Sequence, residues 1–133
     1  MLNLPEVVIA SVSRPDRNAV EVQERLDESR IFLNTLGVEY REGEGIWQGE
    51  TEPCFVIIVR DDVRDKVASY FLNQHNQDCV LHLTTGRTAI LEYQDRKLKK
   101  IGPWRNVGST EAARRIKQGE GCTLCNGEYY CAG

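Results

Sequence analysis

Apolar residues recur along the first third of the chain at two different spacings, which predict a strand followed by a helix. The run Glu6–Ser13, "EVVIASVS", is short, apolar and rich in β-branched residues, which is typical of a strand. Ser13 and Pro15 then offer a cap and a first turn for a helix. The helix is predicted to end at Gly37. Its apolar face follows helical spacing, with Ser29 filling one gap, at Ala19, Val22, Leu26, Leu33 and Leu36.

The middle of the chain continues this alternation of strands and helices. Residues 38–45 alternate apolar and polar side chains and predict a strand, and the unbroken apolar run Cys54–Val59 predicts a strand buried on both faces. Asp61 and Asp62 can cap a second helix. Residues 78–83 and 87–93 predict two strands joined through "TTG", and Ser109 or Thr110 can begin a short third helix.

The predicted order is β-α-β-β-α-β with further β structure after it, and this order favours an α+β fold. It is the ferredoxin-like split βαβ arrangement, an antiparallel sheet with its helices on one face. The other face of such a sheet must also be covered, so we expect a homo-oligomer. Residues 1–118 would form this ferredoxin-like domain, and residues 119–133 a Cys- and Gly-rich C-terminal tail.

Composition and charge exclude several classes of partner. The chain has 133 residues, of which 41% are hydrophobic and 28% charged, as expected of one soluble domain. Its net charge of −3 argues against nucleic-acid binding, and the basic run at 95–105 is interpreted as a solvated loop or hairpin. No apolar run approaches the roughly 20 residues of a membrane span, and the N-terminus does not resemble a signal peptide. We therefore expect a cytoplasmic protein without a membrane partner.

Five cysteines are expected to be thiols or metal ligands in such a compartment, rather than disulfides. Cys122, Cys125 and Cys131 have the spacing C-x2-C-x5-C, which is part of a zinc site, although a structural zinc needs four ligands. Cys54 and Cys79 lie in predicted core strands, and local sequence does not bring His75 or His82 to the tail. A zinc-tailed interaction module, a loose tail with free thiols and a tail that docks on a neighbouring subunit all stay open; we assign no metal and no cofactor.

The histidines do not suggest a catalytic pair. His82 alternates with Leu81 and Leu83, so it is expected to point to solvent or to an interface, and His75 lies in a polar connection. Neither accompanies a recognisable nucleophile motif, and the sequence contains no P-loop, GxGxxG or HExxH.

The stretch "GIWQGETEPCFV" is the strongest candidate for a binding site. Glu52 directly precedes Pro53 and the buried strand, so its carboxylate is held at the end of a sheet and partly desolvated, which suits a cation. Trp47 lies nearby, and an aromatic face beside a carboxylate suits an onium ion. The competing interpretation is a solvated hairpin that carries Glu50 and Glu52 without function.

Several short motifs, in order, make the chain from about Val7 to Val107 resemble the phage S-adenosylmethionine lyases, first described as hydrolases. These motifs are "VIASVSR", a long helix before Gly37, "GIW" leading to "ETEPCFV", "NQDCVL" followed by "TAILEY", and "GPWRNV". The chain also looks like a family of small bacterial proteins without an assigned activity. A non-catalytic small-molecule sensor on the same fold is therefore the alternative hypothesis.

The resemblance implies a PII-like homotrimer of ferredoxin-like subunits that binds S-adenosylmethionine between subunits and needs no cofactor. Such enzymes form methylthioadenosine and homoserine lactone, and in a phage this depletes the methyl donor of host restriction-modification. The family's essential acid falls on Glu52 and its strand-end serine on Ser11. Its active-site tyrosine falls on Trp47, a departure. Arg14 and Glu50 are further substrate-binding candidates.

Overall fold

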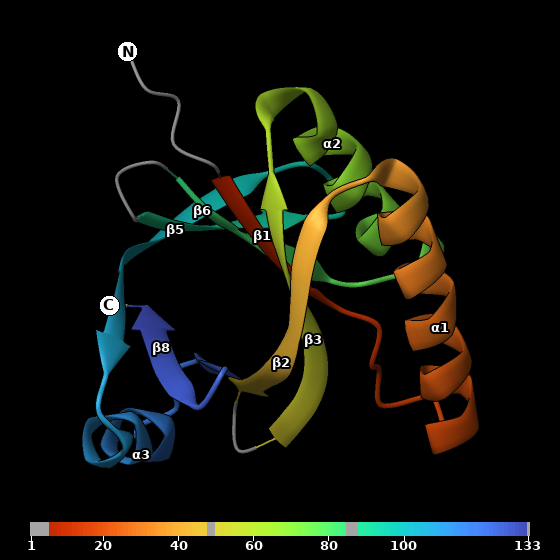
Figure 1. Cartoon of the computed structure of the whole chain (residues 1–133). Helices are drawn as coiled ribbons and strands as arrows, with labels where there is room; N and C mark the ends of the chain where they lie inside the picture. Colours follow the sequence, from red (N-terminus) through yellow and green to blue (C-terminus); the bar gives the residue numbers. More distant parts are fainter. Residues whose placement is uncertain (1–5, 48–49, 85–87, 133) are drawn as a thin grey trace.

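The protein is a closed β-barrel with its helices on the outside (Figure 1). The computed structural model describes residues 6–47, 50–84 and 88–132. Its strands pair antiparallel in the order β1-β3-β2-β7-β8-β6-β5-β4. The strands are β1 (Glu6–Ser11), β2 (Glu39–Trp47), β3 (Glu50–Val59), β4 (Cys79–Leu83), β5 (Thr88–Tyr93), β6 (Leu98–Val107), β7 (Cys122–Cys125) and β8 (Glu128–Ala132). The helices are α1 (Ala19–Leu36), α2 (Asp61–Ser69) with the π-helical turn η1 (Tyr70–Gln74), and α3 (Ser109–Lys117).

The predicted ferredoxin-like split sheet and its PII-like character are wrong. The order of elements up to β4 is as predicted, but the sheet is not open, because four further strands continue from β4 and curl back to β2. The hairpin β7–β8 closes the gap: Ile46 of β2 pairs with Cys122 of β7, and Arg105 of β6 pairs with Cys131 of β8. The Cys- and Gly-rich C-terminal segment thus supplies two strands of the barrel.

Helix α1 begins later than the sequence pattern predicted. Its N-cap is Asn18, whose side chain accepts from the backbone N–H of Glu21 while the Glu21 carboxylate accepts from the Asn18 N–H, so the start is a capping box rather than Ser13 or Pro15. Gly37 ends the helix in the left-handed conformation, as predicted. Helix α2 follows Arg60, which makes no side-chain capping bond, and Asp62 lies within the helix.

One face of the strands packs under α1, α2 and η1 to form the main core. Val8 of β1 and Ile57 of β3 are opposite each other and fully buried, because alternate strand residues point to the same face. Leu33 of α1 and Phe71 of η1 cover them. The opposite face of these strands therefore points into the barrel, away from the helices.

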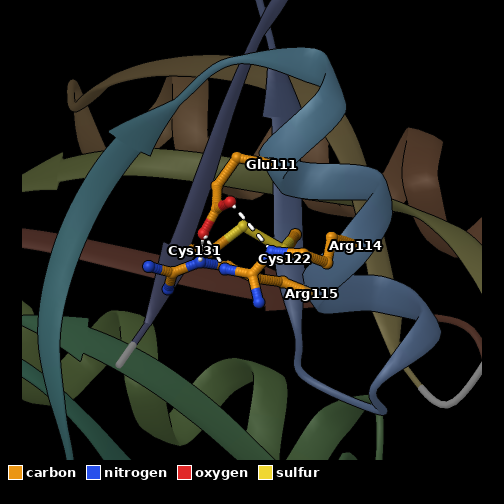
Figure 2. The surroundings of a disulfide bond; sticks show 5 residues. All are labelled: Glu111, Arg114, Arg115, Cys122 and Cys131. Carbon is orange, nitrogen blue, oxygen red and sulfur yellow. Dashed lines mark hydrogen bonds and ion pairs between the residues drawn. A yellow bond between two sulfur atoms is a disulfide. The ribbon is translucent and has the colours of Figure 1, made fainter.

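The C-terminal hairpin has a separate small core under α3. Its turn is Asn126–Gly127, with positive φ at both residues, as a tight two-residue hairpin requires. Cys122 and Cys131 pair across the hairpin and form a disulfide bond, which lies against α3 beside Glu111 and its ion-pair partners (Figure 2). The expectation that the cysteines are thiols or metal ligands is therefore wrong for this pair.

Within the described ranges, no helix combines the length and apolar character that crossing a membrane would require.

Candidate functional site

Ser11 and Glu52, which the sequence singled out separately, meet at one end of the barrel. Ser11 is the last residue of β1 and is opposite Cys54 of β3, two residues beyond Glu52. The Ser11 hydroxyl donates to the Pro53 carbonyl at 2.8 Å and accepts from the Ser13 N–H at 3.1 Å. These bonds fix the hydroxyl where the two strands meet, beside the Glu52 side chain.

The Glu52 carboxyl is partly buried, and its pKa is raised above the ordinary range. Burial is the main cause, and repulsion from the exposed Glu50 carboxylate raises this pKa further. A hydrogen bond from Ser11 opposes the shift. The Ser11 hydroxyl has one proton, so it can serve either the Pro53 carbonyl or the Glu52 carboxylate at one time. A cation bound here would return Glu52 to its charged form.

A row of small side chains lines the inner face beside this pair. Cys54 of β3 lies between Ser11 and Gly43 of β2, and Gly43 lies next to Cys125 of β7. Cys79 of β4 occurs two residues beyond the last β1–β4 pair, so it continues the row on the other side of Ser11. Cys54 and Cys125 are buried free thiols, and burial, with smaller effects from Cys125 and Glu52, raises the pKa of Cys54 to about 12. Cys54 therefore stays protonated and is a poor nucleophile at neutral pH.

A second row on the same face begins at Glu52. Glu52 is opposite Gly45 of β2, Gly45 is opposite Thr123 of β7, and Thr123 is opposite Tyr130 of β8. Directly opposed residues share a face, so these side chains line one wall. Gly45 has no side chain, and a Cβ there would lie 3.9 Å from the Glu52 Cγ. Beside the carboxylate, Gly45 therefore leaves room for at least one further carbon atom without a clash.

Arg14 lies at the same end of the barrel but is engaged with another loop. Its guanidinium donates to the Asn76 carbonyl at 2.5 Å and to Asp78 Oδ1 at 3.3 Å, and it pairs with Asp16. It thus ties the β1–α1 connection to the start of β4 rather than contacting Glu52 in the described structure. Glu50 is exposed, and its backbone pairs with Trp47 at the end of the β2–β3 hairpin. The side chain of Trp47 and residues 48–49 lie outside the described residues.

Sequence reasoning did not find Gly45, Thr123 or Tyr130 as members of this wall. The signal that was available is the pair Asn126–Gly127 between two cysteines, because Asn-Gly flanked by strand residues marks a tight hairpin. Its register, with Thr123 opposite Tyr130, follows from this turn. That β7 then pairs with β2 could not be predicted locally.

The remaining sequence candidates do not assemble into a metal site. Two of the three tail cysteines form the disulfide, which removes the thiolates that the zinc alternative required. In the described part of the chain, no group of three or more His, Cys, Asp and Glu side chains is arranged to hold a metal ion.

Both histidines are buried in polar networks. The expectation that His82 points to solvent or an interface is wrong, because its side chain shares the helix-covered face with Val8 and its Nε2 lies 2.7 Å from Glu92 Oε1. His75 is fully buried and contacts Arg25 and Ser29. Both networks lie on the helix side of the strands, away from Glu52.

Comparison with known proteins agrees with the resemblance noted in the sequence. No curated protein sequence matches the chain. A family model described as the S-adenosylmethionine lyase family matches residues 8–133, which include Ser11, Glu52 and the C-terminal hairpin. The family's name indicates a lyase that acts on S-adenosylmethionine. Because the match covers nearly the whole chain, the chain belongs to the S-adenosylmethionine lyase family.

Proposed function

We propose that the protein cleaves S-adenosylmethionine to methylthioadenosine and homoserine lactone, with Glu52 as the essential carboxylate. The observation that carries this proposal is the meeting of Ser11 and the partly buried Glu52 at the ends of β1 and β3. The missing side chain at Gly45, opposite Glu52, also supports binding of a ligand at that point, because no Cβ competes for the position next to the carboxylate.

The reaction requires few catalytic groups from the protein. The substrate's own carboxylate attacks its Cγ, a C–O bond forms, and the Cγ–S bond breaks with its electron pair going to sulfur. The sulfonium leaves as a neutral thioether, so no general acid is needed. The protein's task is to hold the methionine moiety bent, which can contribute on the order of 7–11 kcal/mol, and to exclude water from a reaction in which opposite charges cancel.

Glu52 would bind the cationic part of the substrate, and Ser11 would orient it. The ammonium and sulfonium are two like charges in one molecule, and a fixed anion is needed to hold them in a partly desolvated site. Ser11 can rotate its hydroxyl from Pro53 toward a substrate oxygen when the cation takes over Glu52. Arg14, Glu50 and Trp47 are proposed as substrate-binding residues around this pair.

We further propose that the active protein is a homotrimer in which a neighbouring subunit covers the end of the barrel where Glu52 lies, so that substrate on this wall is bound between subunits. Large apolar side chains remain two-thirds exposed, namely Val20 at 67%, Ile31 at 67% and Leu98 at 66%. Val20 and Ile31 are three helical turns apart on one side of α1. Light scattering on the purified protein would give the mass of three chains; a monomer would contradict the assembly.

The activity is tested by incubating the protein with S-adenosylmethionine and measuring methylthioadenosine. We expect Glu52→Gln to lower turnover by about 100-fold or more, as loss of an electrostatic partner does in other enzymes. The matched control is Glu24→Gln, at an exposed carboxylate of α1 far along the chain from the site, which should stay near wild type. In ¹⁸O-labelled water, direct attack of water at Cγ would label the homoserine hydroxyl, whereas lactone formation would leave it unlabelled. Binding without product, unaffected by Glu52→Gln, would favour the sensor alternative.

Depletion of the methyl donor used by host restriction is the biological role that we propose.

A further inference from the structure

An aromatic pair on the inner face is not explained by core packing. The rings of Trp104 and Tyr130 are parallel to within 3°, with centroids 6.3 Å apart. Both side chains are partly exposed, and neither belongs to the two buried apolar clusters that the structure describes. Tyr129 behaves differently, because it points to the other face and packs against the disulfide cluster under α3. Rings held partly exposed in this way offer a surface for a flat apolar ligand.

The pair is held rigidly before any ligand arrives. The Tyr130 hydroxyl donates to Glu128 Oε2 at 2.8 Å, and the Asn106 amide donates to the same oxygen at 3.3 Å. Tyr130 also directly precedes Cys131, whose disulfide to Cys122 ties the two strands of the hairpin together (Figure 2). A ring fixed in this way loses little conformational entropy when a ligand stacks on it.

Strand register relates this aromatic pair to Glu52. Tyr130 is the fourth member of the row that starts at Glu52 and passes through Gly45 and Thr123. Three strand spacings separate the two ends, which is roughly 14 Å along the wall. S-adenosylmethionine is an elongated molecule with a cationic amino acid at one end and a purine at the other, so it matches a wall with a carboxylate at one end and an aromatic pair at the other.

We propose that Tyr130, Trp104 and Asn106 form the subsite for the adenine ring, an inference that rests on the proposed function. The purine stacks on the aromatic pair. Its exocyclic amine donates to the Asn106 carbonyl or to the Glu128 carboxylate, which already lie beside the Tyr130 hydroxyl. A carboxamide is well suited to an adenine edge, because it offers an acceptor to the amine and a donor to the ring nitrogen.

The kinetic test compares substitutions at adjacent positions that face opposite sides of β8. Tyr130→Leu should raise KM for S-adenosylmethionine about tenfold, since base stacking on an aromatic side chain is worth about 1–3 kcal/mol, with kcat nearly unchanged. Tyr130→Phe keeps the ring and should stay within about threefold of wild type. The matched control is Tyr129→Phe, which leaves the inner face untouched. An unchanged KM in a folded Tyr130→Leu protein would overturn the subsite.

The specificity test uses Asn106→Ala, a change at an exposed side chain on the same wall. Wild-type protein should bind methylthioadenosine at least tenfold more tightly than methylthioinosine, which lacks the exocyclic amine. Asn106→Ala should remove most of this preference. This measurement also covers the case in which Tyr130→Leu does not fold. Equal binding of the two nucleosides by wild-type protein would contradict the assigned role of Asn106.

Calorimetry with methylthioadenosine separates this inference from the proposed activity, because binding of the product needs no turnover. If wild-type protein binds it and Tyr130→Leu does not, while S-adenosylmethionine is never cleaved, the subsite stands and the lyase proposal fails. If S-adenosylmethionine is cleaved and Tyr130→Leu binds methylthioadenosine as wild type does, the lyase proposal stands and the subsite fails. Glu52→Gln should leave methylthioadenosine binding within about threefold of wild type, because that product carries no positive charge.

Discussion

The hydroxyl of Ser11 donates a 2.8 Å hydrogen bond to the backbone carbonyl of Pro53, the residue that follows Glu52. This contact joins the end of β1 to the beginning of β3 and is formed by residues 42 positions apart. It places a serine hydroxyl at the side of the candidate catalytic carboxylate. The same hydroxyl is the group that lowers the pKa of Glu52 against the effect of burial.

Replacing Ser11 with alanine should therefore shift the pH dependence of activity as well as lower stability. Without the hydroxyl, burial and repulsion from Glu50 act on Glu52 unopposed, so its pKa rises further and the acidic limb of the rate profile moves to higher pH. Loss of one hydrogen bond should lower the free energy of unfolding by about 1 kcal/mol. Ser13→Ala is the control, since its backbone N–H is retained. An acidic limb that does not move would argue against contact between Ser11 and Glu52.

Glu52 itself should lower the stability of the protein at neutral pH. Its pKa is raised in the folded state, so the folded protein binds this proton more readily than the unfolded chain does. The free energy of unfolding therefore falls as pH rises from the ordinary glutamate pKa through the raised one. Glu52→Gln, which removes the charge, should melt at a higher temperature than wild type at pH 7 while losing activity. The melting temperature of Glu50→Gln at pH 7 should rise less than that of Glu52→Gln. A destabilised Glu52→Gln would count against this account.

The sequence predicted the elements that fill the main core, because their apolar positions are local and periodic. The apolar run Cys54–Val59 predicts a strand buried on both faces, and β3 includes it, but only the helix-covered face is fully buried, because Val56 and Ile58 on the inner face are half-buried. Glu52 precedes this run, which is why the sequence points to its carboxylate. The closed barrel could not be predicted in the same way, since β7 carries four residues and its partner, β2, lies about 80 positions earlier. The sequence pattern also predicts the wrong surroundings for His82 of β4. A histidine between two leucines is expected to point to solvent or to an interface, but His82 is buried beside Glu92.

Two glycines of β2 should respond differently to alanine. A Cβ at Gly43 would lie 2.5 Å from the Leu124 carbonyl, and this backbone group cannot move without disturbing the β2–β7 pairing that closes the barrel. Gly43→Ala should therefore lower the free energy of unfolding by about 1–3 kcal/mol, the usual cost of overpacking. Gly45→Ala meets its nearest neighbours at 3.9 Å, an ordinary contact, so its melting temperature should stay close to wild type.

At Gly45, replacement by alanine should change the activity of the protein although it hardly changes its stability. Its new methyl group would stand beside the Glu52 Cγ on the inner face, in the space that we propose for substrate. We expect Gly45→Ala to raise KM for S-adenosylmethionine in a protein of normal stability. Equal kinetics in Gly45→Ala and wild type would indicate that substrate does not occupy this part of the wall.

The disulfide between Cys122 and Cys131 should stabilise the C-terminal hairpin measurably. It links residues separated by nine positions, and closing a loop of that size in the unfolded chain is worth about 2–3 kcal/mol. The double substitution Cys122→Ala and Cys131→Ala should lower the melting temperature by roughly 10 °C. Cys125→Ala, at a free thiol in the same hairpin, is the control. If the reducing agent dithiothreitol shifts the melting temperature of wild type but not of the double variant, the effect belongs to this bond.

The buried His75 should make the protein less stable in mild acid. Ser29 donates its proton to the Arg25 carbonyl at 2.8 Å, so the 3.1 Å contact with His75 requires the Nε2–H as donor. The other ring nitrogen, Nδ1, then accepts from the Arg25 guanidinium at 3.2 Å, which is possible only for a neutral ring. Burial, followed by the charges of Arg25 and Arg17, lowers the pKa of His75 to about 4.

The sign of the pH dependence follows from this depressed pKa. Between pH 6.5 and about 4 the unfolded chain binds a proton at His75 that the folded protein does not, so the free energy of unfolding falls as pH falls through this window. The total change is up to about 3 kcal/mol at 1.36 kcal/mol per pKa unit. We expect His75→Gln to flatten the dependence of urea midpoints on pH over this range. His82→Gln serves as the comparison, and an equally steep profile in His75→Gln would assign the acid sensitivity to another group.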